Sequence, residues 1–209
     1  MKSEESRSSC GPIYMVDDDE SFRKSISRLL SLSGFEVRDF SSVGDFLLAF
    51  PRSSAGCLLL DIKMPGPDGM ELLDYLRKEK VGPPVVFLTG HGDVPTAVEV
   101  MRKGAFDILT KPVEKAQLLR AIQSALMHGA ELDRADQGRR KLRELYDTLT
   151  VTEKEVYQLV VQGLPNKAVA ERIGNAERTV KLHRSNLSRK LGAQCVADLV
   201  RFYFEAGLD

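Results

Sequence analysis

The chain has 209 residues, of which 43% are hydrophobic and 29% are charged, as in a water-exposed globular protein. This length allows one large domain or two small ones. Thirty lysines and arginines balance thirty aspartates and glutamates, which excludes a protein that binds polyanions through its overall charge. Any affinity for nucleic acid must therefore come from a local basic segment.

The N-terminal segment and the cysteines indicate the cellular compartment in which the protein is expected. Residues 1–12 are polar, which predicts a disordered tail and not a signal peptide. No stretch approaches the ~20 apolar residues of a membrane helix, so we expect no membrane partner. The cysteines, Cys10, Cys57 and Cys195, lack metal-ligand spacing and suggest no disulfide framework. We therefore expect a cytoplasmic protein.

Residues 13–127 alternate between short apolar runs and stretches of helical periodicity. Strands are predicted at 13–16, 35–40, 57–60, 85–88 and 106–109. Helices are predicted at about 22–30, 43–50, 70–76, 95–104 and 113–127. Such an alternation predicts an α/β fold with a doubly wound parallel sheet and helices on both faces. Ligands of such sheets bind beyond the carboxyl ends of the strands.

Residues 128–148 are charged and carry no strand signal. Positions 132, 135, 139, 142, 146 and 149 have the spacing of a short coiled-coil seam, but Arg139 lies in it and Gly138 weakens the helix. A solvated helical linker is the favoured interpretation. An all-α domain over 149–209 follows, with helices predicted at about 152–162, 166–173, 176–191 and 195–206.

Polar side chains gather where the predicted strands end. Asp17 and Asp18 follow the first strand, and Asp61, Thr89 and Lys111 end the third, fourth and fifth. Clustered carboxylates need a cation, and a hard ion with oxygen ligands such as Mg²⁺ (or Mn²⁺) fits them. A carboxylate can attack a phosphoryl group, whose oxygens the metal, the lysine and the threonine would stabilise.

Four segments resemble a receiver domain in order and spacing: VDDDE at 16–20, LLLDIKMPGPDG at 58–69, FLTGHGDV at 87–94 and LTKP at 109–112. The resemblance implies a five-stranded sheet in the order 2-1-3-4-5 with five helices. It also implies a sensor histidine kinase as partner. The implied site consists of the phosphoacceptor Asp61, the metal ligands Asp17, Asp18, Asp61 and the backbone carbonyl of Lys63, and the phosphoryl-holding Thr89 and Lys111. Asp19 and Asp68 are expected to be helix caps.

One position departs from the receiver pattern. Many receivers carry Tyr or Phe three residues before the lysine, where this chain has Ile108. Phe106, which we expect on the same strand face, is not a simple replacement. We predict that the switch works through Thr89 and the 89–94 loop, with Ile108 only repacking. His91 lies in that loop, where a solvent-facing side chain is favoured over a role in hydrolysis.

Segment 176–191 is locally basic, with five cations against one acid and a net charge of +4. Val180, Leu187 and Leu191 supply its buried stripe, and Leu182 is a borderline member. The preceding GLPNKAVAERI provides a turn and a short helix. A short helix, a turn and a basic helix indicate a helix-turn-helix.

The segment from LTVTEKEV to SRKLGA resembles the LuxR-type (GerE) DNA-binding domain, and residues 13–206 together resemble FixJ-like response regulators. Mapped onto this motif, backbone phosphate contacts are expected from Lys167, Thr179 and Lys190. Base-edge contacts are expected from Lys181, Arg184 and Ser185. His183 and Asn186 either contact DNA or pack inside the domain. Departures from the motif are Thr152, Asn175 and Ala176, the last at a helix cap that Asn175 could take over.

These patterns predict a two-component response regulator in which phosphorylation of Asp61 controls DNA binding to promoters and transcription by RNA polymerase. We expect a homodimer through residues 95–109 after phosphorylation, with Val98 and Met101 either in the contact or in the core. An alternative function from another class is that of a phosphatase with an aspartyl-phosphate nucleophile. Such enzymes commonly carry an acidic residue two positions after the nucleophile, where this chain has Lys63. We therefore expect no enzyme. A receiver that only binds proteins is the second rival.

Overall fold

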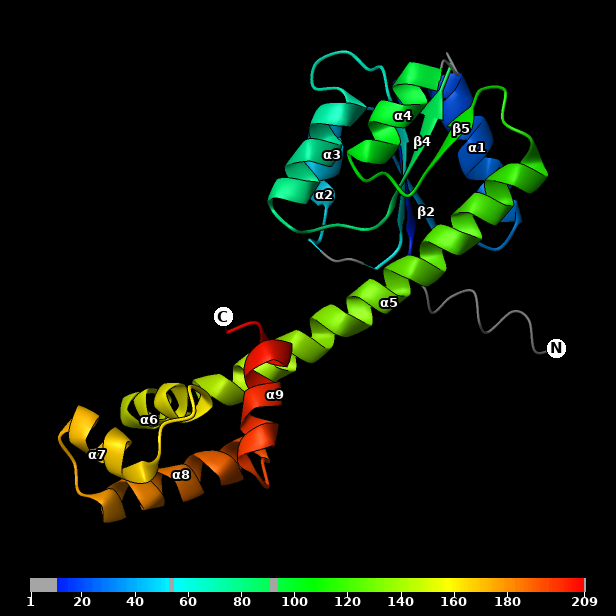
Figure 1. Ribbon diagram of the computed structural model, residues 1–209. Helices are drawn as coiled ribbons and strands as arrows, with labels where there is room; N and C mark the ends of the chain where they lie inside the picture. The colour runs from blue at the N-terminus through cyan, green and yellow to red at the C-terminus, as the bar shows by residue number, and fades with distance from the viewer. Residues whose placement is uncertain (1–10, 53–54, 91–93, 209) are drawn as a thin grey trace. The chain divides into compact units, whose positions relative to one another are not determined.

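The computed structural model describes residues 11–52, 55–90 and 94–208. By its contacts the chain forms two compact units, which meet between Arg134 and Ala135. This boundary falls inside the segment 128–148 that the sequence predicts as a linker. Figure 1 shows the elements of both units in chain order.

The first unit holds a five-stranded, all-parallel sheet in the order β2-β1-β3-β4-β5, which confirms the predicted receiver topology. Its strands are β1 (Ile13–Val16), β2 (Val37–Phe40), β3 (Cys57–Asp61), β4 (Val85–Thr89) and β5 (Asp107–Thr110). Its helices are α1 (Glu20–Leu32), α2 (Val43–Ala49), α3 (Gly69–Lys78), α4 (Val94–Arg102) and the first part of α5 (Lys115–Asp147).

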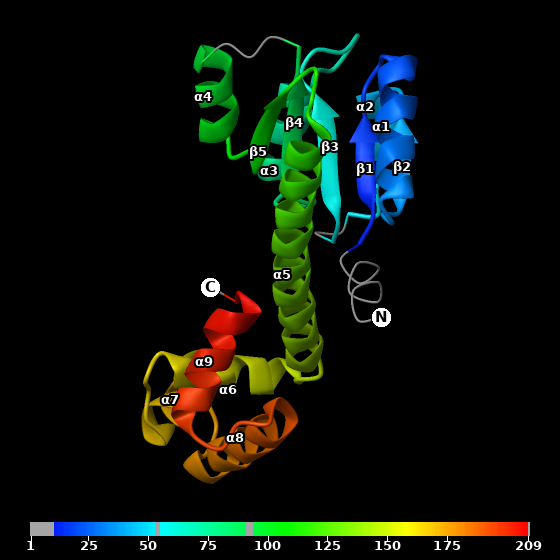
Figure 2. The ribbon, with the colours of Figure 1, turned by 90° about the vertical axis from the view of Figure 1, so that its right-hand side faces the viewer.

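Helices cover both faces of this sheet (Figure 2). One core lies under α2, α3 and α4, where Phe46, Leu72 and Val100 pack against β-strand residues. The other core lies under α1 and α5, with Leu30 and Ile122. All residues of β3 and β4 are buried, as expected for central parallel strands with two covered faces.

Local capping agrees with the sequence at two places. The Asp19 side chain accepts a hydrogen bond from the Phe22 N–H and is the N-cap of α1. Asp68 is the N-cap of α3 and forms a capping box with Glu71. Both predicted caps are confirmed, and each satisfies a backbone N–H that the helix itself leaves without a partner.

The expected position of Phe106 is wrong. β5 begins only at Asp107, so the alternation of faces along a strand does not extend back to Phe106. Phe106 packs with the α1–α5 core and stacks on His128, with ring centroids 5.4 Å apart, whereas Ile108 packs with the α2–α4 core. Residues 1–10 and 91–93, which include His91 and the middle of the 89–94 loop predicted for the switch, lie outside the described residues.

The second unit contains α6 (Val151–Val161), α7 (Asn166–Ile173), α8 (Glu177–Leu191) and α9 (Val196–Ala206), which confirms the four predicted helices. A single core joins them, with Tyr157 fully buried and its hydroxyl donating to the Leu199 carbonyl at 3.0 Å. Among the described helices of both units, none has the length and apolar character needed to cross a membrane.

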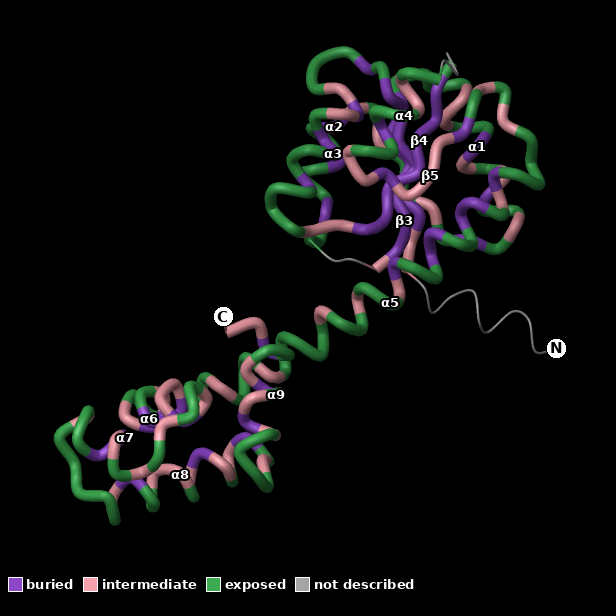
Figure 3. The backbone as a smooth tube through the Cα atoms, in the orientation of Figure 1, coloured by how far each residue is buried: buried purple, intermediate pink, exposed green. Residues whose placement is uncertain are grey.

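α5 does not end where the sequence predicts but continues through residues 128–147. Its middle is mostly exposed, as Figure 3 shows, in agreement with a solvated helix. Its last turns differ, because Leu142 and Tyr146 pack against the core of the second unit. Arg143 also donates to the carbonyls of Ala206 and Gly207, both at 2.9 Å, at the end of α9. The end of the predicted linker is therefore part of the second unit.

Candidate functional site

The parallel strands bring four polar residues to one edge of the sheet. Asp17 follows β1, Asp61 and Thr89 end β3 and β4, and Lys111 follows β5. Lys111 Nζ lies 2.8 Å from Asp17 Oδ2 and 3.2 Å from Asp61 Oδ2. The Lys111 N–H donates to the Thr89 carbonyl at 2.7 Å, which ties the ends of β4 and β5 together. The structure thus assembles residues that are up to 94 positions apart in the chain.

The acidic group suits a hard divalent cation. Asp17, Asp18 and Asp61 each offer a carboxylate oxygen, and these oxygens all lie within 4.8 Å of one another. Asp17 and Asp61 are buried and Asp18 is exposed, so the group opens to solvent on one side. Mg²⁺ takes oxygen ligands and keeps several waters, which an open carboxylate group accommodates. The residues present therefore fit the ion.

Burial shapes the electrostatics of this group. Removal from water raises the pKa of the Asp61 carboxyl above its ordinary value; the charge of Lys111 lowers it again, and the charge of Asp17 adds to the rise. Burial lowers the pKa of the Lys111 ammonium, but the hydrogen bond to Asp17 and the charges of both carboxylates outweigh it, so that pKa is raised. Two buried carboxylates share one ammonium, and the cluster favours a further cation.

The backbone around Asp61 is closely packed. The Asp61 Oδ1 atom accepts a hydrogen bond from the Ile62 N–H at 2.8 Å. Gly69 starts α3 directly beside the strand end, and a Cβ there would lie 2.2 Å from the Asp61 carbonyl oxygen. Only glycine lets the helix approach the strand so closely. Lys63 is exposed two residues beyond Asp61, in the loop between β3 and α3.

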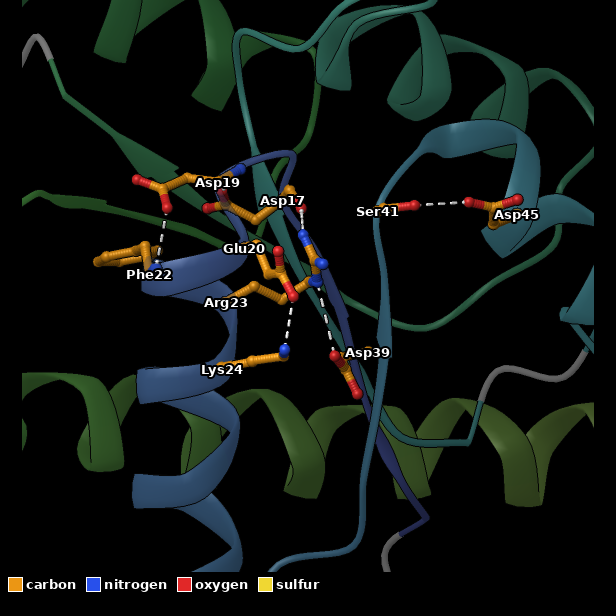
Figure 4. Close-up of polar contacts among 9 residues, drawn as sticks. All are labelled: Asp17, Asp19, Glu20, Phe22, Arg23, Lys24, Asp39, Ser41 and Asp45. Carbon is orange, nitrogen blue, oxygen red and sulfur yellow. Dashed lines mark hydrogen bonds and ion pairs between the residues drawn. The ribbon is translucent and has the colours of Figure 1, made fainter.

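Two α1 residues that the sequence reasoning missed contact the site. Phe22 packs its ring against Lys111, whose Nζ lies 4.3 Å from the ring centroid, a cation–π contact. Arg23 Nη1 donates to the Asp17 carbonyl at 2.6 Å, and Figure 4 shows this side chain between Asp17 and Asp39. Their positions shortly after the acidic segment were the only hint in the sequence that they lie near the site. Sequence position alone does not tell which way their side chains point.

The outer face of α4 carries exposed apolar side chains. Val98 and Met101 are 44% and 45% exposed, whereas Val100 between them is fully buried. The alternative in which Val98 and Met101 belong to the core is therefore wrong. Val94 adds a third exposed apolar side chain at the start of the helix. Ile108 is partly buried and packs with the α2–α4 core.

α8 has the predicted buried stripe of Val180, Leu187 and Leu191. Leu182 is 60% exposed, so its borderline place in that stripe is wrong. Two residues along a helix turn the side chain by about 200°, which places Leu182 opposite Val180.

The polar residues of α7 and α8 differ in exposure. Lys167, Lys181 and Ser185 are exposed, while Thr179, His183, Arg184, Asn186 and Lys190 are partly buried. The N-cap of α8 is Ala176, which makes no side-chain capping bond. Thr152 is partly buried and Asn175 is exposed.

Three of these cations have partners within the unit. Lys181 Nζ lies 3.3 Å from Glu177 Oε1, one turn earlier on α8. Arg184 Nη1 donates to Asn166 Oδ1 at 2.6 Å. Lys190 Nζ lies 2.6 Å from Oε2 of the buried Glu153 and 3.1 Å from the Thr148 carbonyl. The hydrogen bond from Lys190 lowers the pKa of the Glu153 carboxyl. Glu153 is a further residue that the sequence reasoning missed, and the phosphate contact expected of Lys190 competes with this ion pair.

A parallel sheet with an acidic, lysine-containing edge, joined to a helical unit with an exposed basic helix, defines the class of response regulators. The family model of the response regulator receiver domain matches residues 13–123, and that of the bacterial regulatory proteins of the luxR family matches residues 147–203. The chain belongs to the FixJ-like two-component response regulators, which regulate transcription under the control of receiver phosphorylation.

Relatives match along nearly the whole chain. The chain is 42% identical to the C4-dicarboxylate transport transcriptional regulatory protein DctR of Rhodobacter capsulatus, over 90% of this chain and 97% of the relative. It is 39% identical to the transcriptional regulatory protein FixJ of Rhizobium meliloti, over 93% and 96%. Among solved structures, the response regulator StyR is 40% identical with a TM-score of 0.74, over 93% and 98%. The structure of FixJ-N is 41% identical with a TM-score of 0.53, over 56% and 94%.

Proposed function

We propose that Asp61 is the phosphoacceptor and that its phosphorylation drives DNA binding through dimerisation. The observation that carries this proposal is the position of Lys111 Nζ, 2.8 Å from Asp17 and 3.2 Å from Asp61. A lysine held by two buried carboxylates lies where the oxygens of a phosphoryl group on Asp61 need a positive charge. A sensor histidine kinase is the proposed donor.

An oxygen of Asp61 attacks phosphorus, the new O–P bond forms, and the P–N bond to the kinase histidine breaks. The departing imidazole keeps the bonding electrons and takes up a proton. The Ile62 N–H, which bonds Oδ1 at 2.8 Å, orients the carboxylate. Asp17, Asp18, Asp61 and the Lys63 carbonyl would hold Mg²⁺ (or Mn²⁺), which would neutralise the carboxylates and the phosphoryl oxygens. Thr89 and Lys111 then hold the transferred group.

The signal leaves the site through Thr89. Its hydroxyl moves toward the phosphoryl oxygens and draws the loop at 89–94 and the start of α4 with it. Ile108 packs with the α2–α4 core and only repacks, since a branched aliphatic side chain cannot swing in as a ring does. The exposed Val98 and Met101 then join two copies through residues 95–109. A dimer presents two recognition helices to two half-sites.

In the DNA-binding unit, α8 enters the major groove of promoter DNA. Lys181, Arg184 and Ser185 contact base edges, and Lys167 and Thr179 contact phosphates. Asn166 supports this placement of Arg184, because it holds the guanidinium at 2.6 Å. His183 and Asn186 are partly buried in the same helix and have secondary roles. The bound dimer would act on RNA polymerase.

The test is phosphate uptake from a small phosphodonor, followed by intact-protein mass spectrometry. The parent should gain one phosphoryl group in Mg²⁺ and none in chelator. Asp61→Asn should gain none, while the control Asp45→Asn, which removes an exposed carboxylate on α2, should behave as the parent. Equal uptake by Asp61→Asn and the parent would overturn the assignment.

A further inference from the structure

Arg23 is an almost buried cation beside the acidic group. It has no role in the proposed phosphorylation mechanism. It lies in the first turns of α1, and its side chain is only 11% exposed. Its Nη1 atom donates to the Asp17 carbonyl at 2.6 Å, and its Nε atom lies 3.5 Å from Oδ2 of Asp39 on β2. Figure 4 shows the guanidinium between the end of β1 and the middle of β2. One side chain therefore links α1, β1 and β2.

The carbonyl that Arg23 binds belongs to the peptide group between Asp17 and Asp18. Asp17 is fully buried, so packing fixes its side chain, but Asp18 is exposed. The direction of the Asp18 carboxylate therefore depends on the backbone at 17–19. Four hydrogen bonds hold this backbone. The Asp17 N–H donates to the Phe40 carbonyl at 3.3 Å and the backbone N–H of Arg23 donates to the Asp19 carbonyl at 2.8 Å. The Asp19 N–H donates to Asp17 Oδ1 at 2.9 Å, and the Arg23 side chain donates to the Asp17 carbonyl, the peptide group next to Asp18.

Charge explains why an arginine can serve here. A cation next to a metal site repels the metal, unless its own charge is balanced. Asp39 balances Arg23, and so the pair orients the backbone without adding net positive charge. Arg23 can also donate to two acceptors at once, because its guanidinium is a planar fork.

We propose that Arg23, anchored by Asp39, is a positioning residue that orients Asp17 and Asp18 to bind a divalent cation. This proposal rests on the proposed function of the acidic group. Residues behind metal ligands orient the ligands, and their loss typically weakens metal binding by about ten- to a hundredfold. Arg23 makes its contact through a backbone carbonyl, so we expect the lower end of that range.

The experiment measures Mg²⁺ affinity of the full chain by calorimetry, without any phosphodonor. The double variant Arg23→Met/Asp39→Asn is the key protein, because it removes one charge of each sign and leaves the net charge unchanged. We expect it to bind Mg²⁺ about tenfold more weakly than the parent. The matched control is Lys24→Met, which removes an exposed cation of the same helical turn that pairs with Glu20 at 2.5 Å. Its Mg²⁺ affinity should equal that of the parent.

The single variants separate position from charge. If charge alone matters, Arg23→Met strengthens Mg²⁺ binding and Asp39→Asn weakens it; if position matters, both weaken it. Arg23→Lys keeps every charge and the fold, and it should still lose affinity, because lysine lacks the fork. The Mg²⁺ concentration for half-maximal phosphorylation should rise by the same factor, with little change in the rate at saturation.

Two results overturn the proposal. One is parent-like Mg²⁺ affinity in Arg23→Lys and in the double variant, with circular dichroism showing that both are folded. The other is the charge-only pattern in the single variants. If instead the parent itself binds no Mg²⁺ and takes up no phosphate, the proposed function of the acidic group fails as well.

Discussion

Each unit contains a lysine that pairs with buried carboxylate groups, and the two units differ in how many carboxylates share that lysine. In the first unit, Lys111 is shared by Asp17 and Asp61, and burial raises the pKa of Asp61. In the second unit, Lys190 pairs with one carboxylate, Glu153, whose pKa is lowered. A surplus of carboxylate leaves a cluster that favours a further cation, whereas a matched pair ties helices together. Burial dominates at Asp61, which shares its lysine with a second carboxylate, whereas the hydrogen bond from its own lysine dominates at Glu153.

The largest expected effect concerns the boundary of the second unit. A fragment of residues 149–209 lacks Leu142, Arg143 and Tyr146, which pack on its core or bond the end of α9. We expect its free energy of unfolding to lie about 3–5 kcal/mol below that of a fragment of residues 135–209. Urea unfolding of the two fragments checks this. Equal midpoints would mean that the end of α5 adds nothing to this unit.

Removing the matched pair and removing the surplus carboxylate should change stability in opposite directions. Glu153→Gln leaves Lys190 without its carboxylate and should lower the free energy of unfolding of the second unit by about 2–3 kcal/mol, somewhat less than for a fully buried pair. Asp61→Asn relieves the crowding of carboxylates and should raise the stability of the metal-free first unit by about 1 kcal/mol. Calorimetry of the full chain, with hydrogen exchange to assign the transitions, measures both.

The stabilities of the two units should also depend on pH in opposite directions. The folded-state pKa of Glu153 is lowered, so its contribution is complete above its unfolded pKa and is lost as the pH falls through the folded pKa. The folded-state pKa of Asp61 is raised, so the metal-free first unit loses stability as the pH rises from the ordinary aspartate pKa to the raised one. The substitutions should remove these two slopes, one from each unit. If both substitutions removed pH slopes of the same sign, the comparison of the two units would be wrong.

The coupling between site and dimer gives a smaller effect. Thr89→Ala should still accept phosphate but should lose most of the gain in dimer affinity. Ile108→Ala should keep part of that gain and cost about 1–2 kcal/mol of stability, because Ile108 is only partly buried. Sedimentation of parent and variants, with and without phosphodonor, checks this. The account of the loop is wrong if Thr89→Ala keeps the full gain and Ile108→Ala loses it.

The smallest effect separates two lysines of the DNA-binding unit. Lys167 is exposed, so Lys167→Ala should flatten the slope of log affinity for DNA against log salt by about one. Lys190 is held by Glu153, so Lys190→Met should leave that slope unchanged and act through stability. DNA titrations over a range of salt concentrations, at a temperature where both variants are folded, decide between a phosphate contact and a structural tie for Lys190.

Much of the fold could be predicted from the sequence, because burial follows local periodicity. The strand at 57–60 and the helix stripe of Val180, Leu187 and Leu191 depend only on neighbouring residues. The contact of Lys111 with Asp17, 94 residues apart, could also be predicted, because parallel strands end at one edge.

The misses depend on tertiary contacts. Lys190 and Glu153 lie 37 residues apart on two helices, and no periodicity shows that they meet. Phe106 was misplaced because the predicted strand began at 106, whereas β5 begins at Asp107 and the alternation of faces does not reach Phe106. The direction of Arg23 depends on Asp39, in another strand.

The central claim is that phosphorylation of Asp61 controls DNA binding, and the most direct test is DNA affinity of the full chain with and without phosphodonor. A site selected from genomic fragments, labelled for fluorescence anisotropy, serves as probe. In Mg²⁺ the phosphodonor should strengthen binding by the parent at least about tenfold and leave Asp61→Asn unchanged. Equal affinity of the parent in both conditions, with phosphate uptake confirmed by mass, would contradict the account.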